Sequence, residues 1–435
     1  MSFWVEHELA KRAFQQSRKG FLKWIILIAQ WAVALSLAVM ILTLCFVQGF
    51  QNEIADKVFG FWGHISVTHA SQDRSLISHP ISHDERLIEE IRDIEQIWAV
   101  NDGEFNWFSE SPEDGYGASK AGIKAVYSTA LLPGILTVGD EFEGIILKGL
   151  NEEYSNEYLT QYLKKGILPD WNSPETQRQI LISEQTASRL RIDTGQRMII
   201  YFVVEGRQLR RAFEVCGIYR TGLEEYDQKF AIVDIRNIQD ILKWETDLIG
   251  GMEILVDDLD DLDMFTEYIY FDKLPDNLYA ESIRRKYPNI FEWLDLQSIN
   301  RDLIIVLMAL VAIINMITAL LILILERSNM IAVLKSMGAT NWQIRKIFLI
   351  FAAYILTVGL LLGNALGIGI AVAQKLTGFL KLDEANYYLS KVPVHFEWDQ
   401  IMLINAGTFI LTLLILLIPS YLVSRLSPVR VLHFR

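Results

Sequence analysis

The sequence lacks the short motifs of the common catalytic sites. It contains no G-x-x-x-x-G-K-[ST] phosphate loop, no H-E-x-x-H zinc motif and no G-x-S-x-G nucleophile turn. A phosphate loop cradles ATP with backbone N–H groups, and the other two motifs supply a zinc site and an activated serine. We therefore expect no enzyme activity, no catalytic residue and no cofactor on this chain.

Cysteine is scarce, and the histidines show no metal-binding spacing. Cys45 falls in an apolar run and Cys216 in an expected external strand, so the two cysteines cannot pair. Four histidines lie at irregular intervals, which favours exposed loop residues over metal ligands: His64, His69, His79 and His83. We expect neither a disulfide nor a bound metal.

Positive charge is also too sparse for nucleic-acid binding, which needs clustered basic residues. The chain carries 53 acidic residues against 40 lysines and arginines, a net charge of −13. Hydrophobic residues nevertheless make up 51% of the chain and charged residues only 21%. Such a composition requires charge and apolar sequence to be segregated.

Four charge-free apolar runs account for that segregation: Trp24–Gln48, Leu303–Leu325, Ile347–Gln374 and Gln400–Ser424. Each exceeds the roughly 20 residues that a helix needs to cross the hydrocarbon core of a bilayer. The first run is too long for a signal peptide and has no small-x-small cleavage site, so we expect it to be retained. The sequence predicts four transmembrane helices.

The distribution of lysine and arginine predicts the orientation of these helices. Segments 1–23, 326–346 and 425–435 each carry a net charge of +3, whereas 375–399 carries −1 and 49–302 carries −21. Both termini and the 326–346 loop are therefore expected in the cytoplasm. The four predicted spans are 24–48, 303–325, 347–374 and 400–424. The cytoplasmic parts are the N-terminal segment 1–23, the loop 326–346 and the tail 425–435. The external parts are the domain 49–302 and the loop 375–399.

The external segment 49–302 is long enough for one or two domains of the α+β class. We expect helices at Asp84–Ile97, Glu184–Leu190 and Asp260–Phe271. Strands are expected at Ile180–Ser183, Phe230–Asp234 and Met252–Val256, and a hairpin at Met198–Val204 and Arg211–Ile218 around Glu205-Gly206. The fold class is thus a four-helix membrane protein with a large α+β extracytoplasmic domain between the first and second spans.

A short amphipathic helix is predicted in the loop 326–346. Five apolar residues recur at helical spacing and define one face: Met330, Ile331, Val333, Leu334 and Met337. Gly338 ends this helix, because glycine enters the left-handed conformation cheaply. Thr340 and Gln343 form a capping box that begins the next helix. A helix between two spans suits a lever that a soluble partner moves.

Small and polar residues interrupt the apolar pattern of two spans. Gly359, Gly363 and Gly367 form two overlapping G-x-x-x-G steps, which predict close helix packing. Asn315 and Asn364 are costly in lipid unless they face protein or a cavity. Hydrogen bonding between helices is the simpler interpretation of both, and substrate contact is the alternative.

Together these features resemble the permeases of mechanotransmission-type ABC transporters, and the lipoprotein-releasing permeases in particular, over nearly the whole chain. The shared plan is one span, a large external domain and three further spans with the lever segment. The matching motifs are Gly49–Glu53, Gly60, His64-Ile65, Leu181–Leu190, Thr194-Gly195, Gly217–Asp227, Glu326–Phe348, Pro419 and Ser427–Arg430.

The resemblance implies an inner-membrane permease that forms a dimer with a second copy or a paralogue. This dimer would work with a separate ATPase subunit that binds ATP and Mg²⁺. Residues 327–337 would be the coupling helix on that ATPase. The external part would resemble the periplasmic region of the macrolide-efflux permease. The substrate would be a lipoprotein, released from membrane lipid to a periplasmic carrier.

On this resemblance, acyl chains would enter between the outer ends of the first and second spans. The candidate lipid contacts are apolar and bilayer-facing by position: Met40, Leu44, Phe46, Val47, Leu303, Val306, Leu307 and Leu310. Ordinary helix packing is the alternative interpretation of these residues.

The chain departs from the family at one place. The paralogue that recruits the carrier has a long protruding hairpin where this chain has only Val204–Gln208. Two other functions of the same plan remain open. A cell-division permease has a much smaller external domain, and an efflux permease carries its ATPase on the same chain, whereas here 23 residues precede the first span.

Overall fold

The computed structural model describes residues 21–421 except 73–76, 102–105, 112–115, 139–140, 152, 155, 170, 172, 174–177 and 384–386. Most of the predicted N-terminal segment, the tail 425–435 and the Ser427–Arg430 motif lie outside the described residues. The chain divides into two compact units. The helical unit is Met1–Glu53, Glu292–Leu382 and Ser390–Arg435, and the mixed unit is Ile54–Phe291 and Asp383–Leu389.

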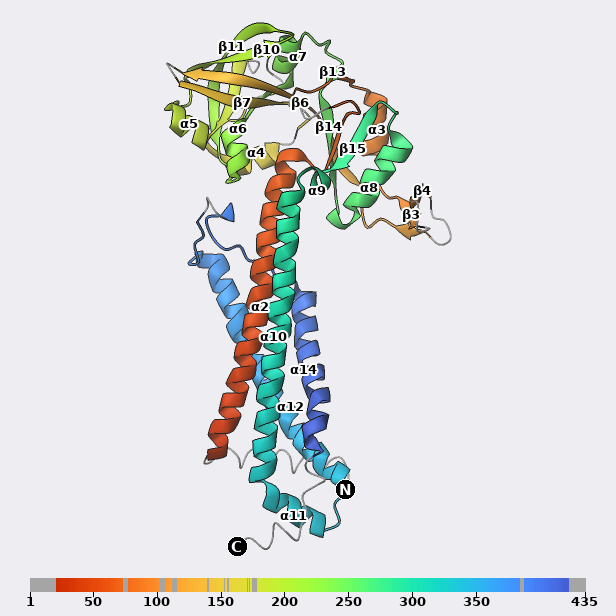
Figure 1. Ribbon diagram of the computed structural model, residues 1–435, viewed down its shortest axis with the longest axis vertical. Helices are drawn as coiled ribbons and strands as arrows, with labels where there is room; N and C mark the ends of the chain where they lie inside the picture. Colours follow the sequence, from red (N-terminus) through yellow and green to blue (C-terminus); the bar gives the residue numbers. More distant parts are fainter. Residues whose placement is uncertain are drawn as a thin grey trace. The chain divides into compact units, whose positions relative to one another are not determined.

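Four long apolar helices and one short helix make up the described part of the helical unit (Figure 1). They are α2 (Phe21–Trp62), α10 (Pro288–Glu326), α11 (Ser328–Ser336), α12 (Asn341–Thr377) and α14 (Trp398–Ser420). The four long helices have the length and composition to cross a membrane, as predicted. The first three of these extend beyond the predicted apolar runs at both ends, because helix propensity does not stop where hydrophobicity does.

Burial is unequal among these helices. Along their apolar stretches α2 and α12 are about half buried, whereas only about a quarter of the residues of α10 and α14 are buried. Val33, Leu37 and Ile41 of α2 meet Phe348, Phe351 and Ile355 of α12 in one core cluster. The pair α2 and α12 is therefore the centre of the unit.

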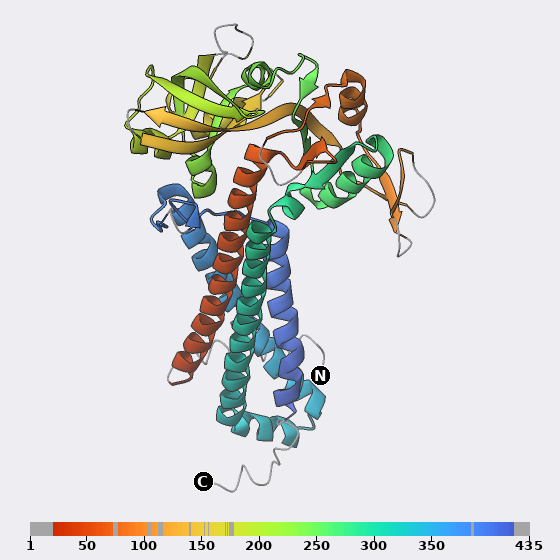
Figure 2. The same ribbon diagram turned by 45° about the horizontal axis from the view of Figure 1, so that its top comes forward.

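A closed ring of six strands forms one part of the mixed unit (Figure 1 and Figure 2). Its order is β10, β11, β9, β12, β7 and β6, and β6 pairs back to β10 through Ile200↔Leu136. The bounds are β6 (Ile123–Val138), β7 (Glu141–Leu150), β9 (Gln179–Ser183), β10 (Arg197–Val204), β11 (Arg207–Tyr219) and β12 (Phe230–Asp234). Closure leaves no free edge among these six strands.

The long strand β6 also begins a second sheet. Its first half pairs with β14 (Gly251–Val256), which continues through β1 (Ile65–His69) to β15 (Leu278–Ser282). Short strands and helices complete the described part of the unit: β2 (Ile81–Ser82), β3 (Trp98–Asn101), β4 (Asn106–Ser109), β5 (Gly117–Ala118), β8 (Leu163–Gly166), β13 (Leu248–Ile249), α3 (Glu85–Arg92), α4 (Asn156–Tyr162), α5 (Glu184–Leu190), α6 (Glu224–Lys229), α7 (Ile235–Leu242), α8 (Leu262–Tyr268) and α9 (Ile283–Lys286). The α+β class is confirmed.

The predicted hairpin is present and its turn is tight. Val204 pairs with Arg207, and the two turn residues Glu205 and Gly206 have φ of 49° and 76°. Positive φ at both positions is the type I′ geometry that matches the twist of the two strands. The extended hook of the carrier-recruiting paralogue is therefore absent from this hairpin.

One predicted helix is wrong in its second half. The helix expected at Asp84–Ile97 ends at Arg92, and residues beyond it pair with a neighbouring segment. The Ile123 N–H donates to the Ile94 carbonyl (2.9 Å), and the Ile97 N–H donates to Ser119 Oγ (3.0 Å). These tertiary hydrogen bonds replace the helical ones, while Ile94 and Ile97 stay buried.

A buried lysine binds the last turn of α2 within the mixed unit. Lys148 of β7 forms an ion pair with Glu253 of β14 (2.7 Å) and donates to the Phe61 carbonyl. Its ammonium also lies over the rings of Phe61 and Trp62. Burial lowers the pKa of Lys148, and the Glu253 carboxylate opposes that shift. A positive charge at a helix C-terminus stabilises the unpaired carbonyls there.

The expectation of exposed loop histidines is wrong. All four are half-buried, and His64 is enclosed beside Phe59, where its Nδ1 accepts the Val256 N–H (2.8 Å). His83 contacts Ser128, and the His69 ring stacks on His79. Within the described ranges no three His, Cys, Asp or Glu side chains gather in a metal-binding arrangement.

Burial lowers the pKa of His64 to about 4. In the unfolded chain His64 would have its ordinary pKa of about 6.5. The contribution of neutral His64 to the free energy of unfolding is therefore fully present above pH 6.5 and is lost as the pH falls toward 4. We predict that the mixed unit is less stable by about 2 kcal/mol at pH 5 than at pH 7.5 through this group. Thermal unfolding of the full chain in detergent at both pH values measures the loss.

The variant His64→Gln keeps an acceptor for Val256 but cannot titrate, so its pH dependence should be correspondingly smaller. His83→Gln serves as the control for removing a half-buried histidine. Equal pH dependence of His64→Gln and the wild type would contradict the assignment.

Candidate functional site

The segment between α10 and α12 forms a helix, a glycine turn and a capped helix start. Gly338 follows α11 with φ of 86°, and the Ala339 N–H donates to the Leu334 carbonyl (3.0 Å). The Thr340 N–H donates to Gln343 Oε1 (2.9 Å), and the Gln343 N–H donates to Thr340 Oγ1 (3.3 Å). The predicted stop and the predicted capping box are both present. The turn between α11 and α12 is thus fixed on both sides.

The predicted apolar face of α11 divides into two parts. Ile331 is fully buried against the core of the helical unit, and Met330 and Leu334 pack partly against it. Val333 and Met337 are exposed, with 49% and 78% of their surface accessible. Ile331 packs α11 against the other helices of this chain. Of the five residues on the predicted apolar face, Val333 and Met337 are the ones exposed to a partner.

The three glycines of α12 lie directly on α2. A Cβ added at Gly359 would come within 2.9 Å of Val33 Cγ1, and one at Gly363 within 2.8 Å of the Ala34 carbonyl oxygen. At Gly367 the nearest atoms are Ala38 Cα and Ile41 Cβ, both at 3.1 Å. A larger residue at Gly359 or Gly363 requires one helix to shift, since real Cβ atoms do not approach other atoms so closely. At Gly367 the neighbouring atoms need to give by only a few tenths of an ångström.

Polar side chains join α12 to α14. Asn364 Nδ2 donates to Asn405 Oδ1 (2.7 Å), and Asn405 Nδ2 donates back to Asn364 Oδ1 (3.1 Å). This pair satisfies two amides that would otherwise be costly in lipid. The sequence singled out Asn364 but missed Asn405, although both interrupt an apolar run. Asn315 of α10 is half-buried.

The eight candidate lipid contacts separate by helix. Met40 and Leu44 are 0% and 2% exposed, so their placement as bilayer-facing residues is wrong in this conformation. Their side chains belong to the helix core, while Phe46 packs partly against it and Val47 is half-buried. On α10 all four candidates are exposed: Leu303, Val306, Leu307 and Leu310. The apolar surface at this end therefore comes from α10.

Polar groups join α2 and α10 beside this surface. Gln51 Nε2 donates to the Leu294 carbonyl (2.6 Å) and to Ser298 Oγ (2.8 Å). Arg301 donates to Gln48 Oε1 (3.1 Å). These bonds hold the two helices together where the predicted apolar runs end.

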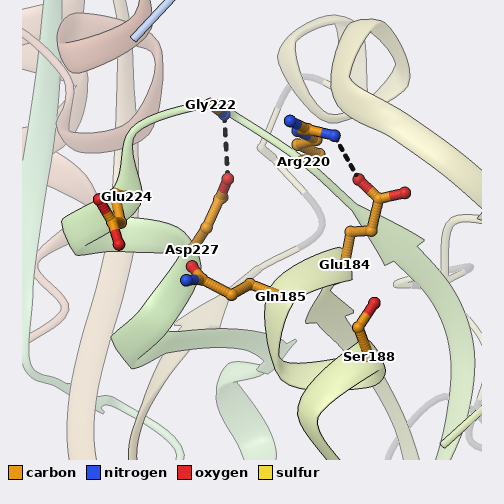
Figure 3. Close-up of a pocket in the computed structure, with 7 residues that line it drawn as sticks. All are labelled: Glu184, Gln185, Ser188, Arg220, Gly222, Glu224 and Asp227. Carbon is orange, nitrogen blue, oxygen red and sulfur yellow. Dashed lines mark hydrogen bonds and ion pairs between the residues drawn. The ribbon is translucent and has the colours of Figure 1, made fainter. Parts of the chain in front are cut away.

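The two motifs Leu181–Leu190 and Gly217–Asp227 together line one open hollow of about 420 Å³ (Figure 3). Arg220 pairs with Glu184 (2.9 Å), and Asp227 accepts from the Thr221 N–H, the Thr221 hydroxyl and the Gly222 N–H. Burial raises the pKa of Asp227, and these hydrogen bonds oppose the shift. Through these hydrogen bonds Asp227 holds the loop at Thr221 and Gly222 against α6.

Comparison with known proteins finds the same resemblance that the sequence motifs indicated. Residues 303–428 match the family described as FtsX-like permease C-terminal. The chain is 21% identical over 436 residues to the lipoprotein-releasing system transmembrane protein LolC of Xylella fastidiosa, covering 96% of this chain and 95% of that protein. It is 21% identical to LolE of Haemophilus influenzae, with 92% of each chain covered.

Two solved structures also align with part of the chain. The periplasmic region of MacB from Actinobacillus actinomycetemcomitans gives a TM-score of 0.32 at 13% identity, covering 52% of this chain and 91% of that one. The extracellular domain of the ABC-type transporter YknZ gives 0.31 at 15% identity, covering 50% and 98%. These scores are too low to carry a conclusion.

The expected resemblance is confirmed by the sequence comparisons. Similarity to both LolC and LolE extends from the first long helix through the mixed unit to the last helix, since more than nine-tenths of each chain is covered. Residues 303–428 therefore match the FtsX-like permease C-terminal family, and nearly the whole chain is similar to the lipoprotein-releasing system proteins LolC and LolE.

Proposed function

We propose that this chain is the permease subunit of an ABC transporter that extracts lipoproteins from the outer leaflet of the inner membrane and passes them to a soluble carrier. The observation that carries the proposal is the end-to-end similarity to LolC and LolE. The ATPase would be a separate subunit, and the transporter would contain two permease chains.

The lever geometry supports coupling to such an ATPase. A subunit bound at Val333 and Met337 would push on α11, whose Ile331 is buried among the other helices. The fixed turn at Gly338–Gln343 would pass that push to α12, and the glycine contact would pass it to α2. ATP-driven closure would then move α2 and α12 as one body.

The exposed stripe on α10 would be the contact for acyl chains. Leu303, Val306, Leu307 and Leu310 are each about half exposed or more and present apolar surface. Each methylene taken from a bilayer is worth about 0.8 kcal/mol, so freeing several chains costs tens of kcal/mol before a carrier accepts them. That cost explains why release would need both ATP and an acceptor.

The short β10–β11 hairpin bears on the role of this chain. Its two-residue turn leaves no extended hook for the carrier. The chain would therefore be the non-recruiting partner in a heterodimer, or would dock the carrier through another surface in a homodimer.

The charge distribution supports a cytoplasmic placement of both termini and of the 326–346 loop. We predict that an impermeant thiol reagent labels a cysteine placed at Ser71 or Asp383 in intact spheroplasts but not one at Ser328. Labelling after lysis provides the control for reactivity. Labelling of position 328 in intact spheroplasts would overturn both the orientation and the lever assignment.

We predict that Val333→Asp and Met337→Asp weaken binding of the ATPase about tenfold or more, because each removes an apolar contact and places a charge in the interface. Co-purification of the ATPase and ATP-dependent lipoprotein release measure the effect. Val333 and Met337 are tested in place of Leu334, because Leu334 packs partly against the helix core of this chain and its replacement would also disturb that core. The exposed Asn341→Asp in the same segment is the matched control. Unchanged co-purification and release would contradict the assignment.

Depletion of the protein tests the proposed function itself. We expect lipoproteins destined for the outer membrane to accumulate in the inner membrane, measured by density fractionation of the two membranes. Expression of the wild type should restore sorting. A septation defect or a loss of drug efflux with normal lipoprotein sorting would replace lipoprotein release with one of those functions.

A further inference from the structure

The segment between α12 and α14 is clasped at its base by one buried glutamine. Gln374 lies in the last turn of α12 and is 1% exposed. Its Nε2 donates to the Leu380 carbonyl (3.1 Å) and to the Val392 carbonyl (2.9 Å), and its Oε1 accepts the Leu380 N–H (2.8 Å). One side chain thereby joins the residues that leave α12 to the residues that return toward α14.

Backbone pairing continues this clasp. The Val392 N–H donates to the Leu380 carbonyl (3.1 Å), and Lys381 faces Lys391 in an antiparallel bridge. Both N–H groups and the oxygen of the Gln374 amide have partners in these two halves. A buried polar group that is fully hydrogen-bonded specifies a single arrangement, so the base of the segment is fixed.

The returning half of the segment packs against α2. The His395 N–H donates to the Cys45 carbonyl (3.1 Å), and Val394 packs partly against the core cluster of the helical unit. A Cβ added at Gly49 would come within 2.8 Å of the Pro393 carbonyl oxygen, so a larger residue there would push the segment away from α2. The segment thus contacts both α2 and α12.

The tip of the segment belongs to the mixed unit. Asp383–Leu389 groups with that unit, whereas the chain on either side of it groups with the helical unit. Buried Lys57 donates from Nζ to the Tyr388 carbonyl (2.9 Å), and Leu389 is also buried. Tyr388 has φ of 58°, which a residue other than glycine adopts at a cost, so the surrounding contacts determine this conformation.

The length of the segment decides what these contacts do. A free chain from Thr377 to Tyr388 could extend to about 35 Å and would absorb a displacement of α12 before it reached the tip. The clasp at Gln374 removes most of that slack, because it holds 380–382 against 390–392. A displacement of α12 would therefore reach Tyr388 over a few residues.

We propose that residues 378–397 act as a strap that passes displacement of α12 to the mixed unit. Gln374 and Gly49 position the strap on α12 and α2, and Lys57 anchors its tip. Its role in transport rests on the proposed function, because it requires ATP-driven movement of α12. The tightness of the strap is independent of transport and is measurable on this chain alone.

Reciprocal coupling between the two ends of the strap tests its tightness. Hydrogen exchange of the full chain in detergent is followed by mass spectrometry, with overlapping peptides that separate the base (380–382 and 390–395) from the tip (387–389). Lys57→Met removes the anchor at the tip and should speed exchange at the base about threefold. Gln374→Leu removes the clasp at the base and should speed exchange at the tip by a similar factor.

Two matched variants control for the chemical change itself. Lys229→Met removes an ammonium from an exposed position on α6, and Thr377→Val removes an exposed hydrogen bond from the same end of α12. Neither should change exchange in the strap, and thermal unfolding checks that every variant is folded. If Lys57→Met and Gln374→Leu each changed exchange at their own end alone, the segment would be an ordinary loop and the proposal would be overturned.

The consequence for transport is measured in proteoliposomes that contain the complete transporter. Gln374→Leu should lower lipoprotein release per ATP hydrolysed about fivefold, while hydrolysis itself changes less than about twofold. Cysteines at Lys381 and Lys391 in this variant, with Cys45 and Cys216 replaced by serine, let a disulfide hold the two halves of the strap together. Oxidation should restore release and reduction should abolish it again.

Release that stays low after oxidation, or hydrolysis that falls in proportion to release, would contradict the role of the strap. A wild type that hydrolyses ATP without releasing lipoproteins would contradict the proposed function instead. The exchange measurements would then still decide whether the strap is tight, so the two proposals fail separately.

Discussion

The close contact between α2 and α12 is the interaction on which the helical unit depends. Three glycines spaced four residues apart let the backbone of α12 reach Val33, Ala34 and Ala38 of α2. Water does not drive helix association inside a bilayer, so van der Waals contact at short range must supply much of the stability. Larger residues at Gly359 or Gly363 would separate the two helices and expose the core cluster.

The remaining helices of the unit are attached to this α2–α12 pair. Ile331 anchors α11 on the helix core, the capping box fixes the direction of α12, and the Asn364–Asn405 pair adds α14. α2 contributes residues to both compact units, and its last turn is bound by Lys148 in the mixed unit. A displacement that begins at α11 therefore meets a series of discrete, well-packed joints. Such joints transmit motion because packed interfaces deform little.

The sequence predicted what local patterns determine. The four long helices follow from charge-free length, the lever turn from Gly338 and Thr340–Gln343, and the tight hairpin from Glu205-Gly206. It could not predict features that depend on distant partners. The helix at Asp84–Ile97 ends early because Ile94 and Ile97 pair with 119–123, and Met40 and Leu44 are buried because other helices cover them. His64 looked like a loop residue because its enclosure by Phe59 and Val256 is tertiary. A single lysine, Lys148, lies in the apolar stretch Ile145–Leu150. That isolated charge could have predicted a buried ion pair, which the sequence interpretation missed.

A reversible disulfide between α2 and α12 tests the central claim that these helices move as one body. Cysteines at Ile41 and Gly367, with Cys45 replaced by serine, place two Cβ atoms 3.1 Å apart. The lower end of the disulfide range, about 3.5 Å between Cβ atoms, is reached when the helices give by a few tenths of an ångström. Lipoprotein release is measured in the same preparation before and after oxidation, and again after reduction. If the contact persists through the cycle, oxidation should leave the release rate unchanged. Loss of release on oxidation, restored by reduction, would show that the two helices must separate and would contradict the account.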